Sequence, residues 1–165
     1  MIHVAICDDS RFTVEEIWTI CNRFFEQKQK KVRTDLFDNS DSLYYEIEDG
    51  TVYHIILLDH MMPQMNGIEC LQRIRTQSGG LNKMTPVVVL TANAGSENQE
   101  IYRTAGFDDC LLKPVSGVAM EEILLKYLPG EKVYRTAPGK AEGEEISTAR
   151  AYTRKIPICI TARFV

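Results

Sequence analysis

The 165-residue sequence lacks the features that would assign it to a membrane or secreted protein. It has no run of about 18 or more apolar residues, the length that a membrane-spanning helix needs. Residues 1–6 carry no positively charged leader before the first apolar stretch, so we expect no secretion signal. We therefore expect a cytoplasmic protein with no membrane partner.

Cysteine is sparse and irregularly spaced. None of the cysteines forms a close pair of the kind that binds zinc; they are Cys7, Cys21, Cys70, Cys110 and Cys159. An odd number of scattered cysteines is more typical of reduced thiols in the cytoplasm than of a disulfide framework.

Most of the chain also lacks an excess of basic charge. Residues 1–129 hold 12 Lys and Arg against 19 Asp and Glu, a net charge of −7, whereas residues 130–165 hold 7 against 4, a net charge of +3. An acidic surface is repelled by the phosphate backbone of nucleic acids. We therefore expect the main domain to bind no nucleic acid.

What the sequence does contain is a regular alternation of two kinds of segment. Short apolar segments rich in β-branched residues predict strands: Ile2–Cys7, Val32–Phe37, His54–Leu58, Pro86–Leu90 and Cys110–Leu112. Between them, apolar residues recur at helical spacing, most clearly from Val14 to Phe25. Five strands alternating with five helices predict an α/β fold, a doubly wound parallel sheet with helices on both faces.

The first helical stripe contains Trp18, which we expect in the core, although part of that helix is also a candidate interface. A weaker fourth helix is marked by Ile101 and Ala105, with Ser96 as its expected N-cap and Gly106 as its end.

The alternation ends at Pro129-Gly130, so we expect one domain over residues 1–129. Residues 130–147 read as a linker, and residues 150–165 as a basic tail of unknown structure. The tail is too short for a winged-helix domain or a phosphotransfer bundle. Its alternating apolar residues, from Ile156 to Phe164, leave two readings open: an unstructured chain end, or a strand added to a sheet edge.

Polar side chains follow four of the five predicted strands at the point where each strand ends. Asp8 and Asp9 follow the first strand, and Asp59, Thr91 and Lys113 end the third, fourth and fifth. Ligands of open α/β sheets bind outside the carboxyl ends of the strands, where the strand order reverses. If the order is 2-1-3-4-5, these five side chains converge on one crevice.

Three converging carboxylates repel one another, and a hard divalent cation is the natural remedy. Mg²⁺ suits such a site because it keeps positions open for water and phosphate. Asp59 can then act as a nucleophile that forms an acyl phosphate, while Lys113 and Thr91 contact phosphate oxygens.

Each residue also has an ordinary structural interpretation when it is taken alone. Asp8 and Asp9, followed by Ser10, are typical of a helix N-terminus, and His60 beside Asp59 is most simply a solvent-facing loop residue. The joint pattern at the strand ends is harder to explain in this way.

The strand ends lie within four longer motifs: HVAICDD (His3–Asp9), ILLDHMMPQMNG (Ile56–Gly67), PVVVLTAN (Pro86–Asn93) and GFDDCLLKP (Gly106–Pro114). As a set, covering about residues 1–129, they resemble the receiver domains of two-component response regulators, and most closely those attached to hybrid histidine kinases. The resemblance implies the flavodoxin-like receiver fold with strand order 2-1-3-4-5.

The resemblance also implies roles for individual residues. Asp8, Asp9, Asp59 and the main-chain carbonyl of Met61 would bind Mg²⁺, and Asp59 would be the phosphoacceptor. Thr91 would be the switch hydroxyl and Lys113 the phosphate-binding lysine, with a cis bond to Pro114. The implied partners are a histidine kinase or histidine-phosphotransfer protein and an unknown downstream protein.

The sequence departs from the family pattern at several positions around the site. Cys110 stands three residues before Lys113, where an aromatic side chain is usual, which puts the usual switch in doubt. Asn66 replaces a frequent Asp before Gly67, with little expected effect. Met61 and Asn93 occupy positions that tune hydrolysis, and we hypothesise that bulky Met61 prolongs the phosphorylated state by limiting water.

These considerations favour a signalling receiver that phosphorylates itself from a phosphohistidine, slowly dephosphorylates itself and has no metabolic substrate. A pseudo-receiver that docks without phosphorylation remains an alternative. A haloacid-dehalogenase-type phosphatase would need a second Asp where Met61 stands. A flavodoxin-like FMN binder would need a small polar loop instead of Asp8 and Asp9.

Overall fold

A computed structural model of the protein describes residues 1–128 and residue 130. These residues form one five-stranded parallel sheet in the order β2-β1-β3-β4-β5, which confirms the expected α/β class and strand order. The strands are β1 (Ile2–Cys7), β2 (Val32–Phe37), β3 (Ile55–Asp59), β4 (Val87–Thr91) and β5 (Asp109–Leu112).

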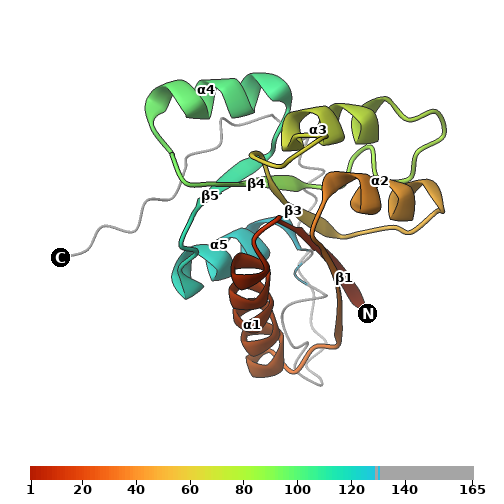
Figure 1. Ribbon diagram of the computed structural model, residues 1–165. Helices are drawn as coiled ribbons and strands as arrows, with labels where there is room; N and C mark the ends of the chain where they lie inside the picture. Colours follow the sequence, from red (N-terminus) through yellow and green to blue (C-terminus); the bar gives the residue numbers. More distant parts are fainter. Residues whose placement is uncertain (129, 131–165) are drawn as a thin grey trace, which may run out of the picture.

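Helices cover both faces of the sheet (Figure 1). On one face lie α1 (Arg11–Gln27) and α5 (Gly117–Tyr127). The other face carries α2 (Ser40–Glu48), α3 (Gly67–Thr76) and α4 (Ser96–Ala105). The continuous apolar runs of β3 and β4 are buried throughout, because both of their faces are covered.

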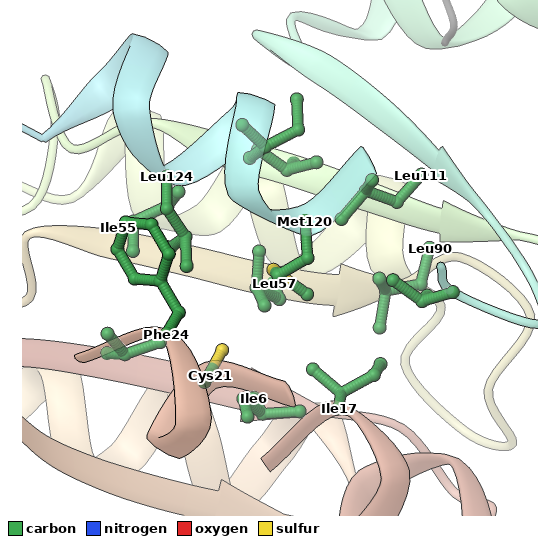
Figure 2. Packing of buried hydrophobic residues seen from close by; sticks show 14 of the residues in the cluster. Ile6, Ile17, Cys21, Phe24, Ile55, Leu57, Leu90, Leu111, Met120 and Leu124 are labelled. Carbon is green, nitrogen blue, oxygen red and sulfur yellow. The ribbon is translucent and has the colours of Figure 1, made fainter. Parts of the chain in front are cut away.

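The core is divided by the sheet into two clusters. In the first, Ile17, Cys21 and Phe24 of α1 pack with Met120 and Leu124 of α5 over the central strands (Figure 2). Each fully buried large aliphatic side chain contributes roughly 1.5–3 kcal/mol relative to an exposed one. The strands are therefore held firmly, and the residues at their ends have a rigid support.

Side chains cap the N-termini of four helices. Ser10, Asn39, Asn66 and Ser116 each accept a hydrogen bond from the backbone three residues later. The exception is α4, whose N-cap is Gly95 and not the expected Ser96, with no side-chain cap. The expected end of α4 is confirmed, since Gly106 adopts the left-handed conformation with φ of 99°.

The expectation that Trp18 lies in the core was wrong. Trp18 lies partly outside it, with 42% of the residue exposed, while its neighbours Val14, Ile17 and Cys21 are buried. On α4 the buried residue is Tyr102, and Ile101 is 51% exposed. The anchor of α4 is thus an aromatic residue that the periodicity did not single out.

The expectations about the tail, the cysteines and membrane-spanning helices can be compared with the described residues only in part. Residue 129 and residues 131–165 lie outside the described part of the chain, and with them the linker, the basic tail and the domain boundary. Cys7, Cys21 and Cys70 are free, as expected, but Cys110 is not among the free cysteines. No helix within residues 1–128 has the length and apolar character to cross a membrane.

Candidate functional site

The candidate site is built where β1, β3, β4 and β5 end at the same edge of the sheet. The parallel register pairs Cys7 of β1 with Leu58 of β3, so the next residues along each strand, Asp8 and Asp59, are neighbours. On the other side of β3, Asp59 pairs with Leu90, next to Thr91. Tight packing of these strands fixes the spacing of the polar side chains that follow them.

Three carboxylates gather at this edge. One oxygen each from Asp8, Asp9 and Asp59 lies within 4.8 Å of the others. Asp8 and Asp59 are buried, with 0% and 2% exposed, while Asp9 faces solvent. Ser10 caps α1, so the capping role that would explain the acidic pair as ordinary helix chemistry belongs to another residue.

Lys113 is the counter-charge of this cluster. Its Nζ lies 2.8 Å from Asp8 Oδ2 and 3.1 Å from Asp59 Oδ1. Burial alone would lower the pKa of Lys113, but its contacts with Asp8 and Asp59 outweigh burial and raise the pKa above its ordinary value. Lys113 is therefore a permanent cation, and its bond to Pro114 is cis, as the resemblance implied.

One carboxylate oxygen in the cluster is only weakly satisfied. The buried Asp59 Oδ1 has the Lys113 ammonium as its close partner at 3.1 Å, and that ammonium also pairs with Asp8 Oδ2 at 2.8 Å. Buried polar atoms without full partners are costly and therefore uncommon. Three carboxylates against one ammonium also leave an excess of negative charge, and all the donor atoms are oxygens. This set fits a hard divalent cation such as Mg²⁺.

The loop after β3 folds back against Asp59. A Cβ atom on Gly67 would lie 2.3 Å from the carbonyl oxygen of Asp59 and 2.8 Å from Cα of His60. The amide of Gly67 also donates a hydrogen bond to the carbonyl of His60, at 3.2 Å. Glycine is required here because the backbone of α3 must approach the backbone of β3 closely. Met61, in the same loop, has a side chain exposed to solvent (70% of the residue).

Thr91 is fully buried, and its hydroxyl has three close partners. The hydroxyl accepts a hydrogen bond from the amide of Asn93 at 3.1 Å and lies 3.0 Å from the carbonyl oxygen of Asn93. The third partner is the hydroxyl of Tyr102, at 2.8 Å. The Thr91 hydroxyl is thus hydrogen-bonded to the loop before α4 and to α4 itself.

Tyr102 is the residue of this region that sequence reasoning missed. Its ring is buried and meets the rings of His60 and Phe107 edge to face, at centroid distances of 5.1 and 6.0 Å. The expectation that His60 faces solvent was wrong, because its ring is half-buried against Tyr102. The signal available in the sequence was a single aromatic residue on an otherwise polar helix.

Two cysteines lie close to the site. Cys7 has a raised pKa, chiefly because it is buried and to a smaller extent because of the negative field of Asp8. Cys110 of β5 is buried and lines one small cavity together with Tyr102 and Phe107.

Comparison with known proteins agrees with this architecture. Residues 4–125 match the response regulator receiver domain. The chain is 32% identical over 114 residues to the transcriptional regulatory protein CiaR of Streptococcus pneumoniae, and 30% identical over 136 residues to the autoinducer 2 sensor kinase/phosphatase LuxQ of Vibrio harveyi. The aligned regions cover 69% and 82% of this chain, but only 46% of CiaR and 15% of LuxQ.

Solved structures show the same fold. A Francisella response regulator receiver domain superposes with a TM-score of 0.60 at 28% identity, covering 77% of this chain and 93% of that one. The receiver domain of a sensor histidine kinase from Pseudomonas aeruginosa gives a TM-score of 0.61 at 24% identity, covering 76% and 96%. The motifs, the strand order and these matches agree: the chain belongs to the family of response regulator receiver domains, the signalling modules of two-component systems.

Proposed function

We propose that the chain accepts a phosphoryl group on Asp59 from the phosphohistidine of a histidine kinase or histidine-phosphotransfer protein. The observation that carries this proposal is the state of the Asp59 carboxylate. It is buried at the end of β3, and its Oδ1 lies 3.1 Å from a Lys113 ammonium that it shares with Asp8. A carboxylate in this state is available to attack phosphorus.

The acidic cluster around Asp59 supports a magnesium ion as the cofactor of this reaction. Asp8, Asp9 and Asp59, with the main-chain carbonyl of Met61, would hold the ion, as the acidic cluster and the family resemblance both suggest. When bound, Mg²⁺ supplies positive charge that neutralises the equatorial oxygens of the phosphoryl group during transfer.

The remaining steps fall to side chains of the protein. A carboxylate oxygen of Asp59 forms a bond to phosphorus while the bond from phosphorus to the donor histidine nitrogen breaks. The imidazole leaves with the electron pair and takes up a proton. The Lys113 ammonium, released from Asp8, pairs with a phosphate oxygen, and the Thr91 hydroxyl turns to donate to another.

The product is a phosphoprotein that signals by contact with a downstream protein. We place this unit in residues 1–129 and propose no metabolic substrate for it, only self-phosphorylation and slow autodephosphorylation. Exposed Met61 and Asn93 flank the site at positions that would tune hydrolysis, and bulky Met61 would limit the access of water. The alternative, a pseudo-receiver that docks without phosphorylation, makes no use of the Asp59 carboxylate as a nucleophile.

Intact-mass measurement with acetyl phosphate and Mg²⁺ tests this function. The wild-type chain should gain one phosphoryl group, and the Asp59→Asn variant should gain none. Asp38→Asn is a matched control, because Asp38 is an exposed carboxylate on a neighbouring loop and should leave phosphorylation intact. A wild-type chain that never gains the group under these conditions would favour the pseudo-receiver.

A further inference from the structure

The helix α4 is held to the rest of the domain in an unusual way. Within the described residues its single buried side chain is Tyr102, at 4% exposed, while Ile101 is 51% exposed. No side chain caps its N-terminus. The position of α4 therefore depends heavily on one ring, which is wedged between His60 and Phe107.

The hydroxyl of that ring is bonded to the candidate switch residue. A threonine hydroxyl can donate one hydrogen bond and accept two. The amide of Asn93 donates one bond to Thr91, and Thr91 has the carbonyl of Asn93 at 3.0 Å as its own acceptor. The remaining acceptor position is filled when Tyr102 donates its proton across the 2.8 Å contact. The one donor and both acceptor positions of the Thr91 hydroxyl are then occupied when Asp59 is unphosphorylated.

We propose that Tyr102 is a positioning residue that couples the state of Asp59 to the seating of α4, through the hydrogen bond between its hydroxyl and Thr91. This inference rests on the proposed function, because it takes Thr91 as the hydroxyl that contacts the phosphoryl group. Thr91 can donate to a phosphoryl oxygen only by giving up its bond to Asn93. Rotation of the hydroxyl toward Asp59 also carries it away from Tyr102.

Loss of that bond leaves a buried hydroxyl with poor alternatives. The nearest other partners are the ring nitrogens of His60, at 3.3 and 3.4 Å, beyond the usual range of a strong hydrogen bond. A buried hydroxyl left with only these long contacts is poorly satisfied, so the ring gains by moving toward solvent, and α4 moves with it. Phosphorylation of Asp59 thus loosens α4 and changes the surface that it presents.

The coupling is reciprocal, and it therefore predicts whether removing the Tyr102 hydroxyl strengthens or weakens binding of the phosphoryl group. If the Tyr102 hydroxyl holds Thr91 in the resting arrangement, removing the hydroxyl must favour the arrangement with a bound phosphoryl group. A residue with a merely structural role would have the opposite effect, because its loss would loosen the site and weaken binding.

The first test uses beryllofluoride, which mimics a phosphoryl group, on the full chain with Mg²⁺. Binding is followed by the ¹⁹F NMR signal of the bound ion. We expect Tyr102→Phe to bind beryllofluoride roughly three- to tenfold more tightly than wild type. Tyr53→Phe is the matched control, because Tyr53 is a tyrosine of similar burial, 3% exposed against 4% for Tyr102, whose hydroxyl bonds Asp35 instead. It should bind as wild type does.

The second test follows amide hydrogen exchange over Ser96–Ala105. In the wild type, beryllofluoride should speed exchange in α4 by about threefold or more. In Tyr102→Phe, α4 should exchange fast already and respond little to the ion. In a Thr91→Val background, Tyr102→Phe should add nothing to the resting rate, because the bond is already gone.

These outcomes test the role of Tyr102 separately from the phosphorylation of Asp59. Unchanged or weaker binding by Tyr102→Phe, or an α4 response equal to that of wild type, would overturn the role of Tyr102 while leaving the proposed function intact. A wild type that binds no beryllofluoride in Mg²⁺ would defeat the proposed function, and the coupling with it.

Discussion

Two carboxylates of the sheet differ in how well their oxygens are hydrogen-bonded. They are Asp35 on the edge strand β2 and Asp59 at the end of β3. Both oxygens of Asp35 accept hydrogen bonds. Oδ2 receives them from His3 at 2.7 Å and Tyr53 at 3.0 Å, and Oδ1 receives one from Arg33 at 3.0 Å. The more deeply buried Asp59 has only the Lys113 ammonium, which it shares with Asp8, and lies among like charges.

The contrast separates a structural carboxylate from a reactive one. A buried polar network stabilises a fold when every member is satisfied, as in the cluster of His3, Arg33, Asp35 and Tyr53. A weakly satisfied carboxylate among like charges costs stability and is retained where chemistry needs it. We therefore expect substitutions in the two clusters to differ in both the size and the sign of their effects on stability.

The largest effect on stability should come from Gly67→Ala, which disturbs the close backbone contact between α3 and Asp59. The new Cβ would lie 2.3 Å from the Asp59 carbonyl oxygen, and neither backbone can yield easily. We expect a loss of about 3 kcal/mol in the free energy of unfolding, measured by urea denaturation. Gly117→Ala is the control, since its Cβ would meet nothing within 4 Å. Equal losses in both variants would contradict the close approach.

Next in size is Asp35→Asn, which breaks the satisfied cluster. The amide cannot accept from His3, Arg33 and Tyr53 together, so the partly buried His3 and Tyr53 donors lose a partner. We expect a loss of about 2 kcal/mol in the free energy of unfolding. Tyr53→Phe removes only one of these bonds and should cost about 1 kcal/mol. An Asp35→Asn variant as stable as wild type would contradict the claim that the hydrogen bonds to Asp35 stabilise the fold.

Asp59→Asn should change stability in the opposite direction. A neutral amide relieves repulsion with Asp8 and Asp9, while Lys113 keeps its bond to Asp8. Without Mg²⁺ we expect a gain of about 1 kcal/mol in the free energy of unfolding. Added Mg²⁺ should stabilise the wild type by a similar amount, about 1 kcal/mol, and the variant by less. Destabilisation of the variant in metal-free buffer would argue against electrostatic repulsion between Asp59 and the neighbouring carboxylates.

The smallest effect concerns pH. Burial alone would raise the pKa of Asp35, but hydrogen bonds from His3, Arg33 and Tyr53 outweigh it and hold the pKa below its ordinary value of 3.8. A lowered folded-state pKa contributes stability that is present above the unfolded-state value and is lost as pH falls through the folded one. The stability gap between wild type and Asp35→Asn should therefore narrow in acid. Urea denaturation between about pH 6 and pH 2 measures it; a gap that widens would contradict the assignment.

The fold and the convergence of the acidic residues could be predicted from the sequence for a physical reason. Strands covered on both faces are read from unbroken apolar runs, such as Ile55 to Leu58, because every side chain must be buried. Once parallel strands are recognised, their carboxyl ends lie at one edge, which brings Asp8 near Asp59. The roles of these residues in phosphoryl transfer stay predictions.

Side-chain direction and partner choice could not be read in the same way. Trp18 falls within the apolar stripe of α1, yet its face turns partly to solvent. Tyr102 was missed because helical periodicity in a polar helix favoured the more apolar Ile101. The contact between Tyr102 and Thr91 joins residues on different elements, and only the packing of α4 against the sheet brings them together.

The most direct test of the central claim is chemical trapping of the acyl phosphate. The chain is incubated with acetyl phosphate and Mg²⁺, reduced with borohydride, digested and sequenced by mass spectrometry. Borohydride reduces an aspartyl phosphate to homoserine with release of phosphate. The account predicts homoserine at position 59 and at no other aspartate. Homoserine at position 8 or 9, or at none, would contradict the assignment of Asp59 as the phosphoacceptor.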